Sequence, residues 1–534
     1  MLSGVSTIDE LFKNTVGQHS DKTALIFQEQ KYTFAELDDL VEKLASFLFN
    51  EGVRKQEKAI IYLPHMPQWV AIWLASQRIG AIAIPVTHFY GEDELGYIAA
   101  DSGAETIFCA DTNLAQVRKV AGNHPFKKIV VVKRDPSGPE PVEEKGEGLF
   151  SFESIAQGNF PSLPHIDLNG NDIAEFLYTG GTTGLPKGVP IPNILFLEAI
   201  TVKRDEIEPL IPRGKGITLQ GAPLNHIMGQ ELGFGSLLNG DTLILLAKMD
   251  LESIFFNIEK HQVNIFFGTP TLCRMILEHN SLDNYKLDSL IYVFTAGEAL
   301  PPEIARKWKN KFGKPLYHGY GATETCGGIT GVSTVIPFPD GTLGKVVPTK
   351  NIKIVNPDTL EPVATNEPGE VLVSSENMVA SYWNKPEETA IHFVELEGLL
   401  WYRTGDIARM DEEGWLFFVD RSADLIKHKG YRVAATKVES ILYRHDSISE
   451  CCVVGVPDPN VGEKVKARII LREGSSTPNA EELIKWCSEG LASYEIPGEI
   501  EFCNELPKSP VGKILRRIVR DEERQKVQSG DQAG

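Results

Sequence analysis

The sequence predicts an α/β fold: a large N-terminal domain of two βαβ-type sheets plus a small β-barrel, followed by a small α+β C-terminal domain. Two long stretches, on either side of a Gly/Thr-rich segment near residue 180, alternate short apolar runs with runs of helical length. Strands separated by helices of this length are typical of parallel sheets built from βαβ units. The chain has 534 residues, too many for one ordinary core, so we expect several subdomains.

The first stretch carries short runs of apolar and β-branched residues separated by polar turns. One segment, 134–148, is rich in Pro, Gly and Glu and poor in apolar residues, which indicates a surface loop. We predict a helix at 69–80 and strands at 60–63, 81–86, 106–110, 128–133 and 173–177.

The second stretch repeats this alternation over about one hundred residues and again favours a parallel sheet. We predict strands at 217–220, 242–246, 264–268, 289–295 and 315–319, and helices at 251–261, 270–279 and 301–312.

The rest of the chain changes character. Residues 341–418 are punctuated by Gly and Pro between short β-type runs, which indicates a barrel-like subdomain. The polar, charge-rich segment 420–430 then precedes a mixed region, so we place the two domains at 1–419 and 420–534. We predict strands at 351–355, 370–374, 451–456 and 465–471, and helices at 480–489 and 514–525.

Composition limits the class of protein. Apolar residues make up 42% and charged residues 24%, as in a soluble globular protein. The formal net charge of −20 disfavours a nucleic-acid partner, which needs a basic face. No apolar run reaches membrane-spanning length, and neither end carries a signal-peptide, lipidation or peroxisomal pattern. We expect a cytoplasmic protein.

The seven cysteines are scattered and odd in number, and none forms a C-x-x-C pair. This pattern favours reduced core thiols over a metal site or a disulfide framework. Cys451 and Cys452 open an apolar run, so strand packing is the expected role of this adjacent pair.

The most informative segment, 178–189, reads Y-T-G-G-T-T-G-L-P-K-G-V after a strand-like run. Glycines let a backbone approach a ligand closely, and free N–H groups in such a turn can hold an anion. Threonine hydroxyls and the Lys187 ammonium would face the same anion, which suits a polyphosphate. The spacing differs from that of the Walker A loop.

This segment resembles the phosphate loop of the adenylate-forming superfamily, which includes acyl-CoA ligases, peptide-synthetase adenylation domains and firefly luciferase. The resemblance covers nearly the whole chain, including Y-T-F-A-E-L at 32–37. It implies a mobile C-terminal domain and an N-terminal domain that binds ATP and the acyl group. The implied phosphate contacts are Thr179, Gly180, Gly181, Thr182, Thr183, Gly184 and Lys187.

Residues 318–325, H-G-Y-G-A-T-E-T, follow a predicted strand and resemble the superfamily's Y-G-x-T-E motif. Ligands of open α/β sheets bind where strands end in this way. The resemblance implies that Glu324 is the catalytic Mg²⁺ ligand, that Thr323 contacts the α-phosphate and that Tyr320 lies along adenine. A hard cation held by one carboxylate and substrate phosphates fits this role. The remaining nucleotide-binding residues implied on this side are Gly297, Glu298, Ala299, Gly319 and Gly321.

Two further motifs lie near the predicted domain boundary. T-G-D at 404–406 resembles the ribose-binding motif, which implies that Asp406 accepts from ribose hydroxyls. The segment 420–432 resembles the hinge motif and implies that Arg421 contacts ribose. It departs from the common pattern at Asp420, Ala423, Ala435 and Lys437, which puts a charge-based account of the hinge in doubt.

The same segment holds the local basic cluster that anionic coenzyme A requires. The resemblance implies that Gly430 lets the CoA arm pass close to the backbone, whereas the alternative is a solvated basic loop. The implied CoA-binding residues are Lys429, Gly430, Tyr431 and Arg432.

Residues 507–517 resemble the C-terminal P-K-x-x-x-G-K motif. The resemblance implies that Lys513 is the catalytic lysine of adenylation, neutralising charge on the carboxylate and α-phosphate oxygens. Electrostatic stabilisation of developing charge is the main tool for such chemistry.

The segment 223–229, P-L-N-H-I-M-G, resembles that of acyl- and aryl-CoA ligases and implies a gate at His226 beside the substrate carboxylate. The alternative for this residue is a core histidine. Short-chain ligases carry Trp where this chain has Gly321, so we expect an acyl group larger than acetyl. The implied acyl pocket comprises His226, Gly229, Gly321 and Gly328, and Phe234, Phe266 and Phe267 are either pocket or core residues.

These resemblances imply an ATP-dependent carboxylate–CoA ligase acting through an acyl-adenylate on a fatty, aryl or alicyclic acid, with ATP, Mg²⁺ and coenzyme A. The alternatives are an acyl-AMP ligase that loads a carrier protein, a luciferase-like oxygenase and a non-catalytic nucleotide-binding scaffold. The partners are small molecules, and both a monomer and a homodimer remain open.

Overall fold

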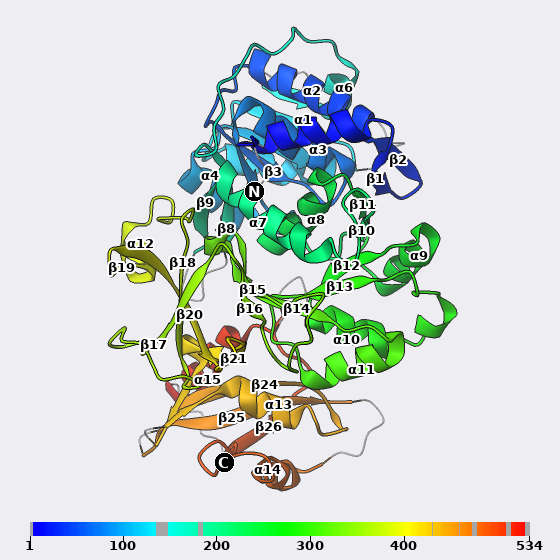
Figure 1. Ribbon diagram of the computed structural model, residues 1–534. Helices are drawn as coiled ribbons and strands as arrows, with labels where there is room; N and C mark the ends of the chain where they lie inside the picture. The colour runs from blue at the N-terminus through cyan, green and yellow to red at the C-terminus, as the bar shows by residue number, and fades with distance from the viewer. Residues whose placement is uncertain are drawn as a thin grey trace. The chain divides into compact units, whose positions relative to one another are not determined.

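The computed structural model describes residues 4–134, 148–179, 185–429, 431–458, 460–472, 478–508 and 514–528 (Figure 1). Most of the loop predicted at 134–148 therefore lies outside the described residues. The chain forms two compact units, the first made of Met1–Asn351 and Val373–Tyr402 and the second of Ile352–Leu372 and Arg403–Gly534. The expected boundary at residues 419 and 420 stays a prediction.

The first unit contains a seven-stranded sheet in the order β7-β6-β5-β3-β4-β8-β9. Its strands pair in parallel except for the hairpin of β8 and β9. The strands are β3 (Lys58–Tyr62), β4 (Ile82–Pro85), β5 (Thr106–Ala110), β6 (Lys128–Val132), β7 (Leu149–Ser151), β8 (Ile173–Thr179) and β9 (Lys187–Pro192).

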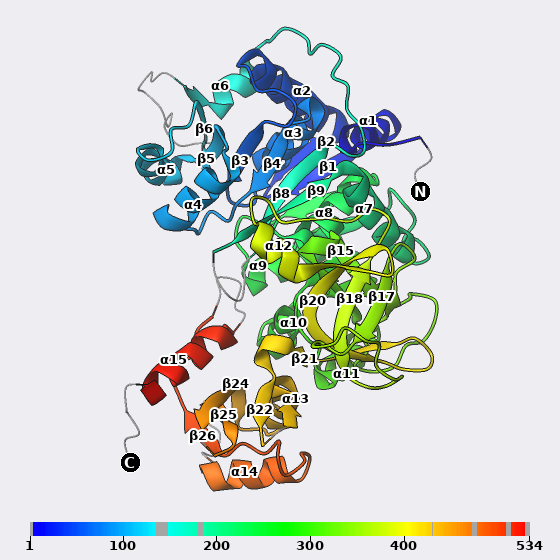
Figure 2. The ribbon, with the colours of Figure 1, turned by 90° about the vertical axis from the view of Figure 1, so that its left-hand side faces the viewer.

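Successive side chains of β3 pack against helices on opposite faces of this sheet. Ala59 and Ile61 belong to one core cluster with α1, α2 and α3, whereas Ile60 and Tyr62 belong to another with α4 and α5. Side chains of a strand point alternately to its two faces, so one run of apolar residues serves both clusters. Figure 2 shows α2 and α3 on one side of these strands and α4 and α5 on the other. The helices are α1 (Ile8–His19), α2 (Phe34–Asn50), α3 (Pro67–Ile79), α4 (Glu92–Ser102), α5 (Leu114–Ala121) and α6 (Phe152–Gln157).

A nine-stranded sheet completes the first unit, in the order β16-β15-β14-β13-β12-β10-β11-β1-β2. Helices α9, α10 and α11 share a core cluster with one of its faces (Figure 1). The strands are β1 (Thr23–Phe27), β2 (Gln30–Thr33), β10 (Ile217–Leu219), β11 (Thr242–Leu245), β12 (Ile265–Gly268), β13 (Tyr292–Thr295), β14 (Tyr317–Ala322), β15 (Gly327–Gly331) and β16 (Lys345–Val346). The helices are α7 (Asn193–Ile207), α8 (Ile227–Leu238), α9 (Leu251–His261), α10 (Pro270–Glu278) and α11 (Pro302–Phe312).

The α/β prediction is confirmed, with one difference: both sheets are mixed. Their antiparallel parts are β1–β2, β8–β9 and β14–β15–β16. Only residues 180–186 join β8 to β9, and so short a connection permits a hairpin but no crossover helix.

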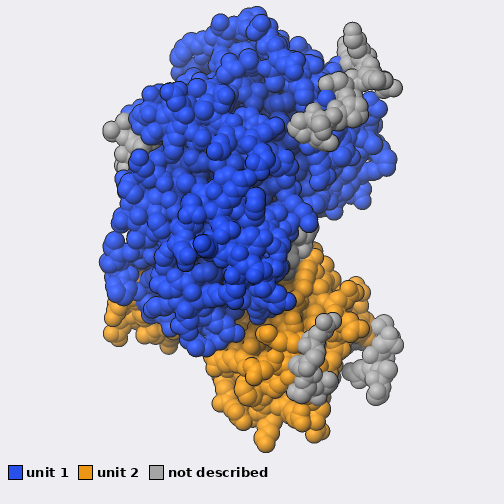
Figure 3. All heavy atoms as spheres, turned by 90° about the vertical axis from the view of Figure 1, so that its right-hand side faces the viewer, with its two compact units in different colours: residues 1–351, 373–402 blue, residues 352–372, 403–534 orange. Residues whose placement is uncertain are grey.

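The predicted barrel-like region forms a five-stranded antiparallel half-barrel of β17, β18, β19, β20 and β21. Strand β20 is long and contributes residues to both units. Figure 3 colours the atoms of the two units separately. The elements are β17 (Asn351–Val355), β18 (Gly369–Ser374), α12 (Pro386–His392), β19 (Phe393–Leu396), β20 (Leu399–Met410) and β21 (Leu416–Arg421).

The second unit ends in a small α+β fold. Adjacent Cys451 and Cys452 belong to different core clusters, the first with α13 and α14 and the second with Val519 of α15. All seven cysteines are free, and burial raises the pKa of Cys452 to about 12. The elements are β22 (Ile426–His428), β23 (Tyr431–Val433), α13 (Ala435–Leu442), β24 (Ile448–Asp458), β25 (Gly462–Leu471), α14 (Ala480–Ser488), β26 (Glu499–Phe502) and α15 (Arg516–Gln528).

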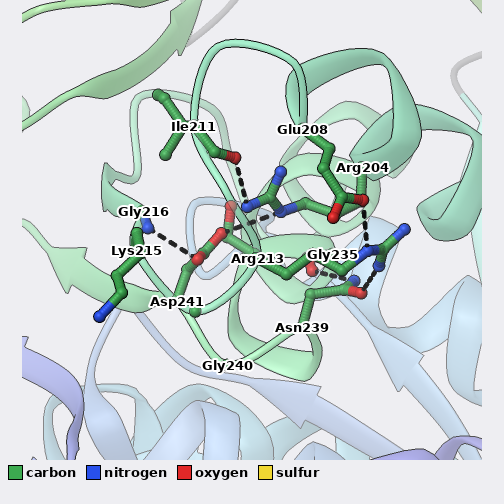
Figure 4. A network of polar contacts seen from close by, with 12 residues as sticks. Arg204, Glu208, Ile211, Arg213, Lys215, Gly216, Gly235, Asn239, Gly240 and Asp241 are labelled. Carbon is green, nitrogen blue, oxygen red and sulfur yellow. Dashed lines mark hydrogen bonds and ion pairs between the residues drawn. The ribbon is translucent and has the colours of Figure 1, made fainter.

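A buried polar network fixes the C-terminal end of α7 (Figure 4). Arg204 Nη2 donates to the carbonyl of Ile211 at 2.9 Å, and its Nε lies 3.2 Å from Asp241 Oδ2. Asp241 Oδ1 accepts from the Gly216 backbone at 2.8 Å. This network joins α7 to the strand that follows it and to the loop after α8.

None of the helices among the described residues is long and apolar enough to span a bilayer.

Candidate active site

The ends of β8 and β9 frame the predicted phosphate loop. Thr179 ends β8, Lys187 begins β9, and the two residues pair in the hairpin register. Lys187 is 8% exposed, and no carboxylate of the described residues lies within ion-pair distance of its ammonium. A buried cation without a carboxylate partner is suited to an anionic ligand. The predicted loop residues Gly180, Gly181, Thr182, Thr183 and Gly184 lie outside the described residues.

Tyr382 brings Lys187 and Glu324 together. Its hydroxyl donates to Glu324 Oε1 at 2.7 Å, and its ring centroid lies 4.4 Å from Lys187 Nζ. Glu324 stands on a 3₁₀ turn, Thr323–Thr325, directly after β14, and is 7% exposed. Burial and the neighbouring carboxylate raise the pKa of Tyr382, so the phenol stays protonated and donates.

The donor set around Glu324 fits Mg²⁺ better than a metal that needs several protein ligands. Among the described residues, no group of three or more His, Cys, Asp or Glu side chains could hold a metal. Mg²⁺ is commonly bound by one or two carboxylates together with substrate phosphates and waters. Glu324 is such a single carboxylate, and no cation of the described residues forms an ion pair with it.

The predicted adenine-side residues lie on neighbouring strand ends. Gly297 follows β13 with a φ of +82°, a conformation that favours glycine. Glu298 Oε2 accepts from the Thr271 hydroxyl at 2.6 Å and from its backbone N–H at 3.2 Å, at the start of α10. Gly319, Tyr320 and Gly321 all belong to β14, whereas Thr323 begins the following turn.

His226 is exposed and directly precedes α8, so it is not a core histidine. The segment before it is anchored by half-buried His65, whose Nε2 accepts from the Leu224 backbone at 3.1 Å. Burial lowers the pKa of His65 to about 4, which keeps it a neutral acceptor. Gly229 lies in the first turn of α8, where a Cβ would be 2.1 Å from the Pro223 carbonyl oxygen.

Gly328 lies directly opposite Gly321 in the hairpin of β14 and β15. A Cβ on Gly321 would lie 2.3 Å from the carbonyl oxygen of Gly327, so a side chain there requires the hairpin to move. The three candidate phenylalanines are fully buried in core clusters, and Phe234 stacks on Trp73 with ring centroids 4.1 Å apart. These three are Phe234, Phe266 and Phe267.

The predicted ribose contacts Asp406 and Arg421 are paired in the second unit. They face each other in the register of β20 and β21, and Arg421 Nε lies 3.2 Å from Asp406 Oδ1. Asp420, a departure from the common motif, is fully buried and accepts from the Thr436 backbone at 3.2 Å in the first turn of α13. Burial raises the pKa of Asp420 to about 6.

Lys429 and Tyr431 of the predicted CoA-binding cluster are exposed. The Tyr431 ring stacks on Tyr494 with centroids 4.2 Å apart. Gly430, the side chain of Arg432 and the predicted catalytic Lys513 lie outside the described residues. The chain on either side of Lys513 is held by a β-bridge between Lys508 and Ile514.

Sequence reasoning missed Tyr382 and a buried group of charged residues, Lys203, Glu231 and Lys350. A single tyrosine in a segment without regular secondary structure carries no recognisable signal. Glu231 did carry one, because a charged residue inside the otherwise apolar, glycine-rich helix α8 is unusual.

Two family descriptions match the chain, "AMP-binding enzyme" over residues 12–383 and "AMP-binding enzyme C-terminal domain" over residues 437–513. The chain belongs to the AMP-binding enzyme family. It is thus a member of the adenylate-forming superfamily and of its AMP-forming acid–CoA ligases.

Curated relatives of this AMP-binding enzyme match it over nearly their full length. A long-chain-fatty-acid–CoA ligase of Bacillus subtilis (strain 168) is 33% identical, over 97% of this chain and 94% of the relative. A 4-coumarate-CoA ligase 1 of Narcissus pseudonarcissus is 28% identical, over 94% and 91%. The crystal structure of an anthranilate CoA ligase with anthranoyl-AMP superposes with a TM-score of 0.88 at 27% identity, over 98% of each chain.

Proposed function

We propose that this AMP-binding enzyme is an ATP- and Mg²⁺-dependent carboxylate–CoA ligase that acts through an acyl-adenylate on an acid larger than acetate. The observation that carries the proposal is the contact of Tyr382 with both Lys187 and Glu324. A buried cation and a buried carboxylate therefore contact the same tyrosine, and neither forms an ion pair among the described residues. Phosphates and a divalent cation are the ligands that satisfy such a pair.

In the proposed first half-reaction, a carboxylate oxygen of the acid attacks the α-phosphorus of ATP and pyrophosphate leaves. Lys187 and the threonines of the loop neutralise the phosphates, Glu324 holds the Mg²⁺, and Lys513 stabilises the developing charge. Bound Mg²⁺ supplies charge neutralisation on the phosphate oxygens. Asp406 and Arg421 hold the ribose.

In the proposed second half-reaction, the CoA sulfur attacks the acyl carbonyl and AMP leaves. Gly430 and its basic neighbours Lys429 and Arg432 guide the CoA, and His226 gates the acyl site. This step requires the domain 420–534 to move relative to 1–419. The names of the relatives, a long-chain fatty acid ligase, a 4-coumarate ligase and an anthranilate ligase, support a substrate among fatty and aryl acids, with alicyclic acids as a further class. We propose a cytoplasmic location.

A pyrophosphate-release screen over fatty, aryl and alicyclic acids, with and without CoA, tests the proposal. We expect pyrophosphate with at least one acid and an acyl-CoA product when CoA is present. Acyl-AMP formation without CoA consumption, but with transfer to a carrier protein, would replace CoA ligation by carrier loading. Light emission or oxygen uptake would indicate an oxygenase, and no reaction with any acid would contradict the proposal.

A further inference from the structure

A small hollow in the first unit is lined by three ionisable side chains that the proposed chemistry does not use. Lys203 of α7, Glu231 of α8 and Lys350 surround it, together with Gly328 of β15. The three charged residues are 5%, 7% and 7% exposed. The hollow has room for about one water-sized group, so a small substituent can enter it but a long chain cannot.

Lys203 has a carboxylate and an aromatic ring as partners within the protein. Its ammonium lies 2.8 Å from Glu206 Oε2 and 3.9 Å from the ring centroid of Phe294. Glu206 Oε1 in turn accepts from the Tyr292 hydroxyl at 2.8 Å. This side of the hollow is therefore an ion pair with no net charge.

Glu231 and Lys350 have few hydrogen-bond partners, although opposite charges act on both: against the larger effect of burial, Lys203 lowers the pKa of Glu231 and Glu198 raises the pKa of Lys350. The one hydrogen bond of the Glu231 carboxylate within the described residues is a long one, 3.4 Å from the Gly328 backbone N–H. The Lys350 ammonium has one partner there, the Ser375 hydroxyl at 3.3 Å. Burial is the main cause that raises the pKa of Glu231 to about 7 and lowers the pKa of Lys350.

Lys466 is a buried lysine of the same protein that has a full set of carboxylate partners. It is 5% exposed, close to Lys350, but its ammonium lies 2.7, 2.7 and 2.8 Å from Glu499, Glu501 and Glu523. An ammonium has three protons to donate, and a buried charge left short of partners costs several kcal/mol. The hollow at Lys350 therefore has the character of a binding site rather than of a structural ion pair.

The hollow adjoins the candidate acyl pocket. Gly328 lines both, and it pairs directly with Gly321 across the β14–β15 hairpin. Glu231 lies on α8 two residues, little more than half a turn, beyond Gly229. A group bound between Glu231 and Lys350 would thus belong to the acid rather than to the nucleotide.

We propose that this hollow receives a hydroxyl or oxo substituent of the acid, remote from the reacting carboxylate, so that the substrate is a hydroxy- or oxo-acid. This inference rests on the proposed ligase function. A hydroxyl can donate to Glu231 and accept from Lys350 at once, and an oxo group accepts from Lys350. An unsubstituted acid adds no partner to the single hydrogen bond that each group has, and a second carboxylate would face Glu231 and Glu206.

The test compares acids that share one skeleton and differ in one substituent. Hexanoate, 6-hydroxyhexanoate and adipate form one series, and benzoate, 3-hydroxybenzoate and isophthalate form another, each measured by kcat/KM for pyrophosphate release. We expect the hydroxylated member of at least one series to exceed the unsubstituted member by about tenfold or more, because sites that bind a hydroxyl discriminate strongly against its absence. Equal or better use of the unsubstituted acids in both series, or a preference for the dicarboxylates, would overturn the inference.

Two variants, Glu231→Leu and Lys350→Met, locate the preference. Each should bring the ratio between hydroxylated and unsubstituted acid towards one, mainly by slowing the hydroxylated acid, while exposed Lys286→Met leaves the ratio unchanged. Wild-type ratios in both folded variants would overturn the assignment to this hollow. If a variant does not fold, the wild-type substituent series still decides the question.

The two proposals fail in distinguishable ways. Release of pyrophosphate with unsubstituted acids and no preference for hydroxylated ones overturns the inference alone. Absence of pyrophosphate release with every acid overturns the ligase function and the inference with it.

Discussion

Tyr382 donates its hydroxyl to Glu324 at 2.7 Å, and both residues are buried in the first unit. The two are 58 positions apart in the sequence, so their meeting depends on the fold. The hydrogen bond orients one carboxylate oxygen of Glu324 and leaves the other for a cation. The same ring lies beside Lys187, which makes Tyr382 a positioning residue for two candidate nucleotide contacts.

Tyr382→Phe should weaken adenylation while leaving the protein folded. The variant keeps the ring beside Lys187 but leaves the buried Glu324 carboxylate without its donor, a loss of about 1–3 kcal/mol. We expect kcat/KM for pyrophosphate exchange to fall roughly 5- to 150-fold, with a higher Mg²⁺ concentration needed for half-maximal rate. The value of kcat/KM should fall further in Tyr382→Leu, which removes the ring as well. Unchanged Mg²⁺ dependence in the Phe variant would show that the hydrogen bond does not orient the carboxylate.

Lys513→Ala should abolish acyl-AMP formation and spare thioester formation from preformed acyl-AMP. The lysine is proposed to stabilise charge in the first half-reaction only, and removing one preorganised charge costs on the order of 2–4 kcal/mol. Rapid-quench assays of each half-reaction provide the measurement. Lys508→Ala is the matched control, because Lys508 Nζ is engaged 2.7 Å from Glu450. Equal losses in both half-reactions of the Lys513 variant would remove the single-step role.

Gly321→Ala should destabilise the protein because of backbone crowding rather than pocket filling. A Cβ at this position would be 2.3 Å from the Gly327 carbonyl oxygen, and forced repacking of this kind costs about 1–3 kcal/mol. Gly297→Ala provides the contrast, since no atom lies within 4 Å of its Cβ position but its φ of +82° costs about 1–2 kcal/mol. Urea unfolding of both variants measures the two effects. Full stability of Gly321→Ala would mean that the hairpin yields easily.

About half of the strands and helices in the described residues were predicted from sequence, because their apolar patterns are local. Helix 251–261 and strand 106–110 agree with α9 and β5 to the residue. The antiparallel hairpins at the sheet edges were missed, because pairing direction depends on connection length and on which strand is the neighbour. The expectation that Gly321 leaves room for an acyl group larger than acetyl stays a prediction, and its close surroundings are set by the strand opposite.

Some residues of the candidate site could likewise be named from local sequence motifs, and others could not. Lys187 and Glu324 belong to contiguous motifs and could be named from sequence, and the structure brings both to Tyr382. Lys203 and Lys350 could not be named from sequence, because they come together with Gly328 of β15 only in the fold. Tyr382 could not be named either, because its contacts with Lys187 and Glu324 join distant parts of the chain. The buried charge of Glu231 was visible in the helix pattern, but its partners were not.

Glu175→Gln should remove part of the loss of stability at alkaline pH. Glu175 is fully buried in β8, accepts from Trp73 Nε1 at 3.0 Å, and burial raises its pKa to about 8. A carboxyl whose folded pKa is raised contributes stability below its unfolded pKa, near 4.5, and loses that contribution as the pH rises to about 8. Glutamine resembles the protonated form and does not ionise, so the difference in Tm between variant and wild type should grow in favour of the variant from pH 5 to pH 9.

The difference in unfolding free energy between those two pH values should reach on the order of a few kcal/mol, by linkage. Glu231, whose pKa is raised to about 7, acts in the same direction and leaves some pH dependence in the variant. The control is Glu376→Gln at an exposed position, and its Tm should change with pH as the Tm of the wild type does. Parallel behaviour of Glu175→Gln itself from pH 5 to pH 9 would show that Glu175 does not titrate in this range, and that Trp73 and its neighbours stabilise its ionised form.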